Sequence, residues 1–434
     1  MSLDDSPYQG YLYAYPHKSA YRRLQPRLRL EEVWAAERQD ALFGYVHIPF
    51  CEMRCGFCNL FTRANPHADQ VTAYLAQLRS QAAAVRDSLS PGAAFSRVAV
   101  GGGTPTYLDA AELESLFDIM AATFGEAPGP MSVETSPATA TPDRLAVLAD
   151  RGTTRVSIGV QSFLDAEARA AGRPQRLGEV LAALEAIRAA RVPVLNIDLI
   201  YGIAGQTART WQHSLDQALR WRPEELYLYP LYVRPLTGLA GREHGRADWD
   251  RQRQALYRQA VDVLTGAGYD QHSMRQFRRR DAPAVDGPDY CCQDDGMVGL
   301  GCGSRSYATT LHYSFDYAVS VTEVRAVITD YLARLPDDFR YAEIGFHLDG
   351  LEQRRRWLLK SLLRADGVDA GAYQHRFGTT HDADFPQLGE LVARGWLDPG
   401  RRVLTADGLA RSDSIGSWLV SGRVREAMEG YIPR

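Results

Sequence analysis

The chain has 434 residues, of which 45% are hydrophobic and 24% are charged, and this composition is typical of a folded globular protein rather than a disordered or fibrous one. Lys plus Arg number 49 against 53 Asp plus Glu, so the net charge of -4 argues against wholesale binding of nucleic acid or anionic membranes. The length suits two or three average domains, or one large α/β barrel with an appendage.

No stretch approaches the roughly eighteen consecutive apolar residues of a membrane span. The N-terminal segment MSLDDSPYQG is acidic and polar, unlike an export signal. We therefore expect a cytoplasmic protein with no membrane partner. Lys18 and Lys360 are the only lysines, a bias best explained by codon usage, although an arginine-rich protein has many guanidinium groups available for carboxylates and phosphates.

Short apolar runs alternate with amphipathic helical segments between about residues 45 and 235, as expected for repeated βα units around a parallel sheet. The predicted strands are Tyr45 to Ile48, Arg97 to Val100, Met131 to Glu134, Arg155 to Gly159, Val194 to Ile200 and Glu225 to Leu231. Six such units predict an α/β fold, a partial (β/α)6 TIM-type barrel. Its active site is expected at the carboxyl ends of the strands.

The two flanks of the predicted barrel differ from it in pattern. Residues 1–44 form an N-terminal arm, and residues 45–335 contain the barrel. From 340 to 434, short helices are followed by a turn and a last helix, the outline of a small winged-helix-like α+β module that would cover the barrel mouth. Charges of both signs are mixed in this module, so no nucleic-acid partner is expected.

Six cysteines are too few to staple a chain of this size, and three of them fall within eight residues, which indicates a metal site. Cys51, Cys55 and Cys58 form a C-x3-C-x2-C motif directly after the first predicted strand. Soft sulfur ligands select zinc or iron-sulfur clusters. A structural zinc would need a fourth ligand, such as His47 or His67. Three thiolates on a four-iron cubane instead leave one iron open for chemistry.

The motifs YVHIPFC, GGGTPT, SIGVQSF and NIDLIYG follow one another along the chain, with Phe57 directly before the third cysteine. Together they resemble the oxygen-independent coproporphyrinogen III oxidase-like branch of the radical S-adenosylmethionine (SAM) superfamily, from about Tyr11 to the end. The resemblance implies a 4Fe-4S cluster on Cys51, Cys55 and Cys58, whose open iron chelates SAM. One electron then cleaves SAM to methionine and a 5'-deoxyadenosyl radical, which abstracts hydrogen from a substrate. A flavodoxin- or ferredoxin-like electron donor is implied as well.

Carried over residue by residue, the family pattern implies positions around the cluster-bound SAM. These are Tyr45, Gly102, Glu134, Gln161 and Arg173. Successive glycines let the backbone approach a ligand closely, Gln161 can exchange hydrogen bonds with ribose hydroxyls, and Arg173 can meet the SAM carboxylate as a fork. Taken singly, a capping Glu, a buried amide and a surface Arg are the more ordinary interpretations.

Some members of this branch bind a second SAM. The matching positions are Phe57, Gly103, Thr104, Asp198, Leu231 and Arg305. An unpaired carboxylate at Asp198, inside an apolar strand, would be costly, so a ligand is expected there. The sequence leaves open whether a second SAM binds and whether it donates a methyl group or a second radical.

The cluster motif departs from that of the authentic coproporphyrinogen oxidases, which carry another Cys two positions after the third, where this chain has Leu60. Haem-carrier relatives also lack that Cys. The sequence therefore predicts a radical SAM enzyme acting on a small molecule, such as a tetrapyrrole or a natural-product intermediate. The alternatives are a radical methyltransferase or haem- or porphyrin-modifying enzyme, a haem-binding carrier of the same fold, and a merely structural metal protein. No catalytic residue is assigned.

Several other residues have two open interpretations. Tyr15, His17 and Arg22 either contact substrate or belong to a packed N-terminal arm. Cys302 is expected to be a small buried filler, and His272 a satisfied core histidine. The vicinal pair Cys291 and Cys292 is expected to be free thiols, since a mutual disulfide would be strained.

Overall fold

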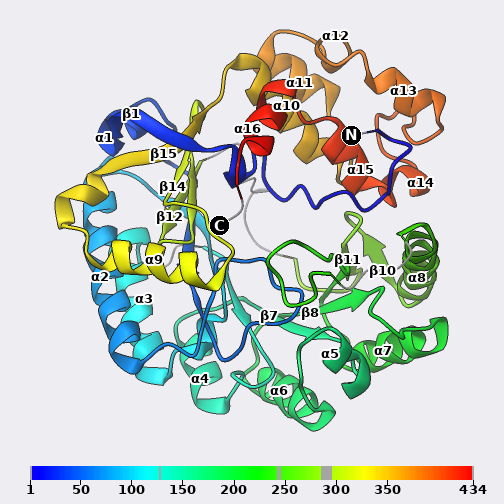
Figure 1. Ribbon diagram of the computed structural model, residues 1–434, viewed down its shortest axis with the longest axis horizontal. Helices are drawn as coiled ribbons and strands as arrows, with labels where there is room; N and C mark the ends of the chain where they lie inside the picture. Colours follow the sequence, from blue (N-terminus) through cyan, green and yellow to red (C-terminus); the bar gives the residue numbers. More distant parts are fainter. Residues whose placement is uncertain (1, 127–128, 242–245, 285–295, 433–434) are drawn as a thin grey trace.

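The computed structural model describes residues 2–126, 129–241, 246–284 and 296–432 (Figure 1). All six predicted strands are present, and they lie side by side in chain order as parallel neighbours. They are β2 (Leu42–Ile48), β5 (Phe95–Gly102), β6 (Met131–Thr135), β7 (Arg155–Gln161), β8 (Val194–Tyr201) and β9 (Glu225–Pro230). Their apolar residues are almost wholly buried, as expected for parallel strands covered on both faces.

Helices connect these strands and form the outer layer of the fold (Figure 1). They are α2 (Ala68–Asp87), α3 (Ala110–Phe124), α4 (Pro142–Asp150), α5 (Asp165–Ala170), α6 (Leu177–Ala189), α7 (Ala208–Arg220) and α8 (Arg246–Gly266). The start of α3 shows why the chain turns where it does. Asp109 accepts from the Glu112 amide at 2.9 Å, and the Glu112 carboxylate accepts from the Asp109 amide at 2.9 Å. This reciprocal cap satisfies helix donors that would otherwise lack partners.

The sheet extends beyond the six predicted strands to thirteen, but it does not close. Next to β2 lie β12 (Met297–Leu300), β13 (Arg305–Tyr307), β14 (Leu311–Ser314), β15 (Tyr341–His347) and β1 (Arg22–Arg29), and next to β9 lie β11 (Gln276–Arg279) and β10 (Tyr269–Gln271). Most of the added strands are three or four residues long, too short for a clear sequence period. The architecture is a partial TIM-type barrel, whose sheet includes β1 from the N-terminal arm and β15 from the start of the C-terminal segment.

Beyond β15 the chain is helical and has its own apolar core (Figure 1). Its helices are α10 (Gly350–Leu362), α11 (Ala370–Phe377), α12 (His381–Asp384), α13 (Leu388–Ala393), α14 (Ala406–Leu409), α15 (Ser412–Trp418) and α16 (Gly422–Glu429). The core of this segment also takes in Leu3, Tyr15 and Tyr21 from the N-terminal arm. The turn predicted before the last helix contains a single β-bridge, between Leu397 and Leu404; within it the Asp398 amide donates to the Val403 carbonyl and the Arg402 amide to the Asp398 carbonyl.

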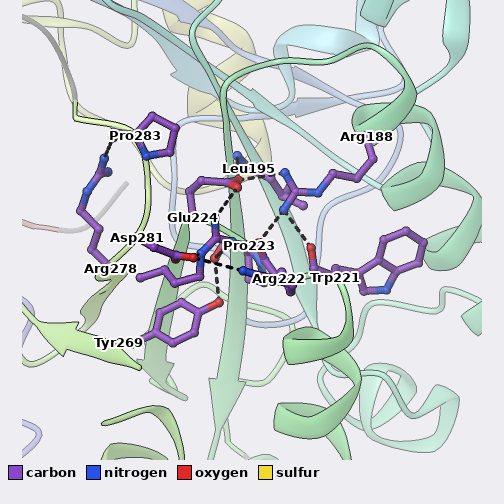
Figure 2. A network of polar contacts seen from close by, with 11 residues as sticks. Arg188, Leu195, Trp221, Arg222, Pro223, Glu224, Tyr269, Arg278, Asp281 and Pro283 are labelled. Atoms are coloured by element: carbon purple, nitrogen blue, oxygen red, sulfur yellow. Dashed lines mark hydrogen bonds and ion pairs between the residues drawn. The ribbon is translucent and has the colours of Figure 1, made fainter. Parts of the chain in front are cut away.

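Four arginines surround two adjacent carboxylates where β8 and β9 begin, and we call this arrangement the basal network. Figure 2 shows the part of it around Glu224, with Arg188 and Leu195. Glu224 pairs with Arg188 at 2.9 Å and Arg279 at 3.3 Å, while Glu225 pairs with Arg155 at 2.8 Å and Arg278 at 2.7 Å. Glu224 also accepts from the Leu195 amide at 2.9 Å. The basal network thus ties β7, β8, β9 and β11 together at the end of the barrel opposite the carboxyl ends of the strands.

The remaining elements are short or peripheral. They are α1 (Leu30–Ala35), α9 (Val321–Leu332), the paired strands β3 (Phe50–Cys51) and β4 (Arg63–Ala64), and the 3-10 turns Lys18–Ala20, Pro105–Tyr107 and Pro336–Arg340. In the part of the chain that the structure describes, no helix is both long enough and apolar enough to cross a membrane.

Candidate functional site

The three cysteines lie on a loop that leaves the carboxyl end of β2. Cys51 ends β3, and its Sγ accepts from the Thr104 hydroxyl at 3.6 Å. The Cys58 amide donates to the Cys55 carbonyl at 3.0 Å, and the thiols of all three are free and partly exposed. Gly56, between the cysteines, donates to the Gly172 carbonyl at 3.0 Å, which fixes the loop against the chain after α5.

The chemistry of these thiols suits a bound metal cluster. Burial raises the pKa of Cys51 to about 12 and also raises that of Cys55, so a cationic centre is needed to hold them as thiolates at neutral pH. Among the described residues, no three His, Cys, Asp or Glu side chains come close enough to enclose one metal ion. A cubane does not need such convergence, because each thiolate binds a different iron. His47, a candidate fourth zinc ligand, instead bonds through Nε2 to the Phe61 carbonyl at 3.0 Å.

The glycine run at the end of β5 passes close to the backbone before the cysteines. The Gly103 amide donates to the Ile48 carbonyl, and the Thr104 amide to the Phe50 carbonyl, both at 2.8 Å. A β-carbon at Gly103 would lie 2.6 Å from the Phe50 oxygen. Gly102 has φ +111°, and a β-carbon there would lie 2.5 Å from the His47 ring. Glycine is therefore required at both positions for β5 to approach the cysteine loop.

Glu134, near the end of β6, accepts from the Gly102 amide at 3.2 Å. Its side chain is surrounded by protein but still accessible to water, as expected of a group that faces the open mouth of the barrel. Burial, together with the Asp198 carboxylate, raises the pKa of Glu134 to about 7. The structure thus places an acceptor that gains or loses a proton near neutral pH beside the glycine run.

Gln161, at the end of β7, is held in a strained backbone conformation. Its φ is +66°, and the register of β7 against β8 shifts between Gly159 and Gln161. A β-carbon at Gly159 would lie 2.6 Å from the Gln161 amide nitrogen and 3.2 Å from the Arg173 guanidinium. The irregularity in β7 therefore leaves the Gln161 and Arg173 side chains packed over the Gly159 backbone at the barrel mouth. Strain of this kind is concentrated at functional sites.

Asp198 in β8 does not stand unpaired, as its apolar strand suggested. It accepts from the Asn196 amide at 2.7 Å and from the Ser157 hydroxyl at 3.3 Å. Burial still raises the pKa of Asp198 to about 6, although these two donors and Arg155 oppose the rise. The carboxylate is oriented by neutral donors but not neutralised by a direct ion pair with a cation.

Phe57 and Leu231 lie in one small apolar cluster beside the cysteine loop, together with Ile200, Ile203 and Leu239. The Leu231 amide donates to the Tyr201 carbonyl at 2.8 Å, and the Leu239 amide to the Gly56 carbonyl at 2.8 Å. This apolar cluster shields one side of the cysteine loop from water.

Arg305 and Tyr45 lie on the opposite side, towards β12 and β13. The Arg305 guanidinium packs over the Tyr13 ring at 4.6 Å from its centroid, and its Nη1 is buried without a hydrogen-bond partner. Tyr45 bonds to His47 Nδ1 at 3.4 Å; burial raises the pKa of Tyr45, as does the Glu134 charge, while Arg305 lowers it. A buried cation with an unused donor at this point is suited to an anionic group.

Hydrogen bonds, charges and packing link the predicted positions into one region at the carboxyl ends of the strands. The links are Thr104 to Cys51, Gly102 to Glu134, Glu134 to Tyr45 and to Asp198, Arg173 to Cys55 and to Asp198, Arg305 to Tyr45, and Phe57 to Leu231. Gln161 joins them by packing beside Arg173 over Gly159.

Of the three N-terminal residues with two open interpretations, Tyr15 and Arg22 belong to a packed arm, whereas His17 lies at the barrel mouth. Tyr15 donates to Glu352, and Arg22 donates to the Ala427 carbonyl, so both attach the arm to the C-terminal helices. His17 instead faces the barrel mouth, near Tyr13, with which it bonds at 3.4 Å, and near the Arg305 charge, which lowers its pKa together with burial.

The other residues singled out in the sequence lie apart from the site. Cys302 is fully buried, as predicted. His272 is half-buried at a turn after β10, so it is not the core histidine that we expected. Its backbone amide fixes the turn by donating to the Gln276 carbonyl at 2.8 Å. Cys291 and Cys292 lie outside the described residues.

Sequence reasoning missed the tyrosine and lysine side chains that the arm and the loop before α9 bring to the mouth. Lys18 donates to the Gly303 carbonyl at 2.9 Å and lies 5.9 Å from the Tyr317 ring centroid. The Tyr317 ring lies 5.5 Å from that of His17. The scarcity of lysine was the available signal, since Lys18 is one of only two in the chain.

The structure is a partial parallel barrel with a three-cysteine loop at its mouth, and residues 45–218 match the model of the radical SAM superfamily, so the chain contains a radical SAM domain. Members of that superfamily use a 4Fe-4S cluster and SAM. The chain is homologous to the branch that contains heme chaperones and oxygen-independent coproporphyrinogen III oxidases.

Two curated relatives and one solved structure are similar to this chain. The chain is 26% identical over 378 residues to the heme chaperone HemW of Escherichia coli, covering 81% of this chain and 90% of that protein. It is 33% identical over 243 residues to the oxygen-independent coproporphyrinogen III oxidase of Escherichia coli, covering 55% and 52%. The solved structure of coproporphyrinogen III oxidase (HemN) from Escherichia coli shares the fold, with a TM-score of 0.76 at 23% identity over 93% of each chain.

Proposed function

We propose that this protein is a radical SAM enzyme that reductively cleaves SAM at a cluster held by Cys51, Cys55 and Cys58 and abstracts hydrogen from an anionic aromatic substrate. The observation that carries the proposal is the convergence of the cysteine loop with the glycine run and Glu134. Three free thiols, a close backbone approach and a proton-exchanging carboxylate meet at one end of the barrel. These are the groups that a cluster-bound amino acid requires.

The cluster and SAM, when bound, supply the one-electron chemistry. The chain's own residues bind, orient and shield. Glu134, fixed by the Gly102 amide, is placed to accept from the SAM amino group. Arg173 is placed to form a fork with a carboxylate, and Gln161 to bond with hydroxyl groups. The apolar cluster of Phe57 and Leu231 excludes water, which would otherwise quench a reactive intermediate.

The positions that the family pattern assigns to a second SAM would hold either a second nucleoside or the substrate itself. Asp198 keeps a carboxylate oriented towards the mouth, while Arg305 keeps a donor free on the other side. Gly103 and Thr104, which belong to this second set, lie against the cysteine loop. Two SAM molecules would then share one wall of the barrel.

The mouth also favours a planar, negatively charged substrate such as a tetrapyrrole. Tyr11, Tyr13 and Tyr317 provide ring faces, and the cations Lys18 and Arg305 lie among them. Burial of Lys18 beside Arg305 lowers its pKa to about 7, so an anion entering the mouth would stabilise its charge. Aromatic and cationic side chains in this mixture suit ring systems with carboxylate groups.

A haem-binding carrier is the second candidate, because similarity to heme chaperones covers four fifths of the chain. The same cations and ring faces would hold haem without turnover of SAM. The two candidates differ in what happens to SAM and not in the architecture.

The test is anaerobic reconstitution with iron and sulfide, followed by SAM and dithionite. Formation of 5'-deoxyadenosine supports the enzyme, and S-adenosylhomocysteine appearing with it identifies methyl transfer. Tight stoichiometric haem binding with negligible SAM cleavage supports the carrier instead. Protein that holds zinc alone, with no iron signal in Mössbauer spectra after reconstitution, contradicts both.

A further inference from the structure

A cavity of about 190 Å³ lies where the N-terminal arm, the chain after β10 and helices α10 and α15 meet. Its walls are largely apolar and aromatic, formed by Leu12, Met274, Leu359, Leu363, Tyr11 and Tyr13. An apolar cavity of about 150 Å³ is large enough to hold benzene. The space is therefore of the size that a small ring compound needs.

The charged groups around this cavity are paired, with one exception among the described residues that line it. Arg275 pairs with Asp413 at 2.7 Å, and Arg364 pairs with Asp366 at 3.0 Å. The Lys360 side chain lines the cavity, but its Nζ is buried and has no hydrogen-bond partner. The lining therefore carries one uncompensated positive charge when Lys360 is protonated.

Lysine at this position has a property that arginine lacks. Burial, together with the Arg364 and Arg376 charges, lowers the pKa of Lys360 to about 7. A guanidinium would stay charged and unpaired, whereas the amine can remain neutral until an anion arrives. The only other lysine, Lys18, differs, because its Nζ donates to the Gly303 carbonyl at 2.9 Å. Lys360 has no such partner for its amine.

The cavity is next to the barrel mouth and shares a wall with it, formed by Tyr11 and Tyr13. Arg275 packs over the Tyr11 ring at 3.8 Å, the Tyr229 ring of β9 lies 6.3 Å from that ring, and Arg305 packs over the Tyr13 ring at 4.6 Å. None of the residues that line the cavity belongs to the predicted cluster or SAM positions.

We propose that this cavity binds a small amphipathic monocarboxylate, whose carboxylate pairs with Lys360 and whose ring or alkyl part lies among Leu359, Leu363, Met274 and the tyrosines. One uncompensated cation matches one negative charge, so a monoanion fits better than a phosphate dianion. The four-carbon stem of Lys360 lets the amine turn from its buried position towards the ligand. The site does not depend on the cluster chemistry of the barrel.

The test uses benzoate and its neutral analogue benzamide with the full-length, reconstituted protein. Because the chain contains two lysines, labelling with lysine carrying 13C at Cε gives two side-chain NMR signals, and Lys360→Arg removes one of them and assigns it. We expect benzoate, but not benzamide, to move the Lys360 signal saturably. Lys360→Met should weaken benzoate binding at least about tenfold, since a charged hydrogen bond is lost.

Arg423→Met is the matched control, because it removes a paired surface cation from the same helical segment. Benzoate affinity should be unchanged in that variant, and near-UV circular dichroism should show that both variants are folded. The proposal is overturned if the Lys360 signal does not respond to benzoate, if benzamide moves it equally, or if Lys360→Met binds benzoate as the parent does. None of these outcomes bears on whether the protein cleaves SAM.

Discussion

Buried carboxylates are ion-paired with arginines at one end of the barrel and have no ion-pair partner at the other. At the basal network, Glu224 and Glu225 are each contacted by two arginines at 3.3 Å or less. At the mouth, Glu134 and Asp198 have only neutral hydrogen-bond donors, and burial raises the pKa of both. On the cationic side of the mouth, Arg305 keeps a buried donor without a partner.

This difference separates residues that hold the fold from residues kept ready for ligands. A carboxylate enclosed by arginines has its desolvation cost offset within the chain and gains nothing from a ligand. A carboxylate or guanidinium without an ion-pair partner leaves part of that cost to be offset by whatever binds. Variants at each end test whether the paired charges act on stability and the unpaired charges on ligand binding.

The largest effect is expected for Cys55→Ala. Loss of one thiolate should abolish the cluster's visible absorption after reconstitution and all formation of 5'-deoxyadenosine, because two cysteines hold the cubane poorly. Absorption spectroscopy and chromatography of SAM products measure this. Cys302→Ala is the control, since Cys302 is buried away from the loop, and it should retain both. Persistence of absorption and cleavage in Cys55→Ala would remove the ligand assignment.

Gly102→Ala tests the close backbone approach at the mouth. The new β-carbon would lie 2.5 Å from the His47 ring in a conformation with φ +111°, at a cost of about 1–3 kcal/mol. SAM binding should weaken by roughly tenfold to a hundredfold in equilibrium binding measurements. Gly178→Ala in α6 is the control, because the space around it is open, and it should stabilise the protein by about 0.5–1 kcal/mol. Equal SAM affinity in both variants would show that the glycine run is only a turn.

Glu224→Gln tests the basal network. Removing this carboxylate leaves Arg188 without its carboxylate partner and Arg279 with only the exposed Asp281, so urea unfolding should show a loss of about 2–3 kcal/mol with SAM affinity unchanged. Asp281→Asn removes an exposed partner of Arg279 and should cost less than about 1 kcal/mol. A change in SAM affinity without a change in stability would contradict the division between the two ends.

The smallest effect is a pH dependence at the mouth. The pKa of Glu134 is raised from 4.5 to about 7, so its proton is bound more tightly in the folded state. Its stabilising contribution is complete below about pH 4.5 and is lost as the pH rises through about 7. Because water reaches this side chain and screens it, we expect about 1 kcal/mol. Urea unfolding of cluster-free protein between pH 5 and about pH 8 should show this decline, and Glu134→Gln should lack that part of it.

The six central strands and the cysteine loop could be predicted because their signals are local. Apolar runs such as Val194 to Ile200 specify a buried parallel strand, and C-x3-C-x2-C places its ligands on one short loop. The added strands at the β2 side could not be predicted, since β12 and β13 are three or four residues long and are specified by pairing partners far away in the sequence.

By itself, the sequence determined the βα barrel, the three-cysteine loop and the glycine run, because each is encoded by spacing within a few residues. Only the tertiary structure decided which charges are neutralised. It enclosed Glu224 and Glu225 with four arginines from three other elements, gave Asp198 neutral donors, and placed Lys360 without a partner beside a cavity. Charge pairing acts through space over a few ångströms, and a linear pattern carries no record of which distant side chains come that near.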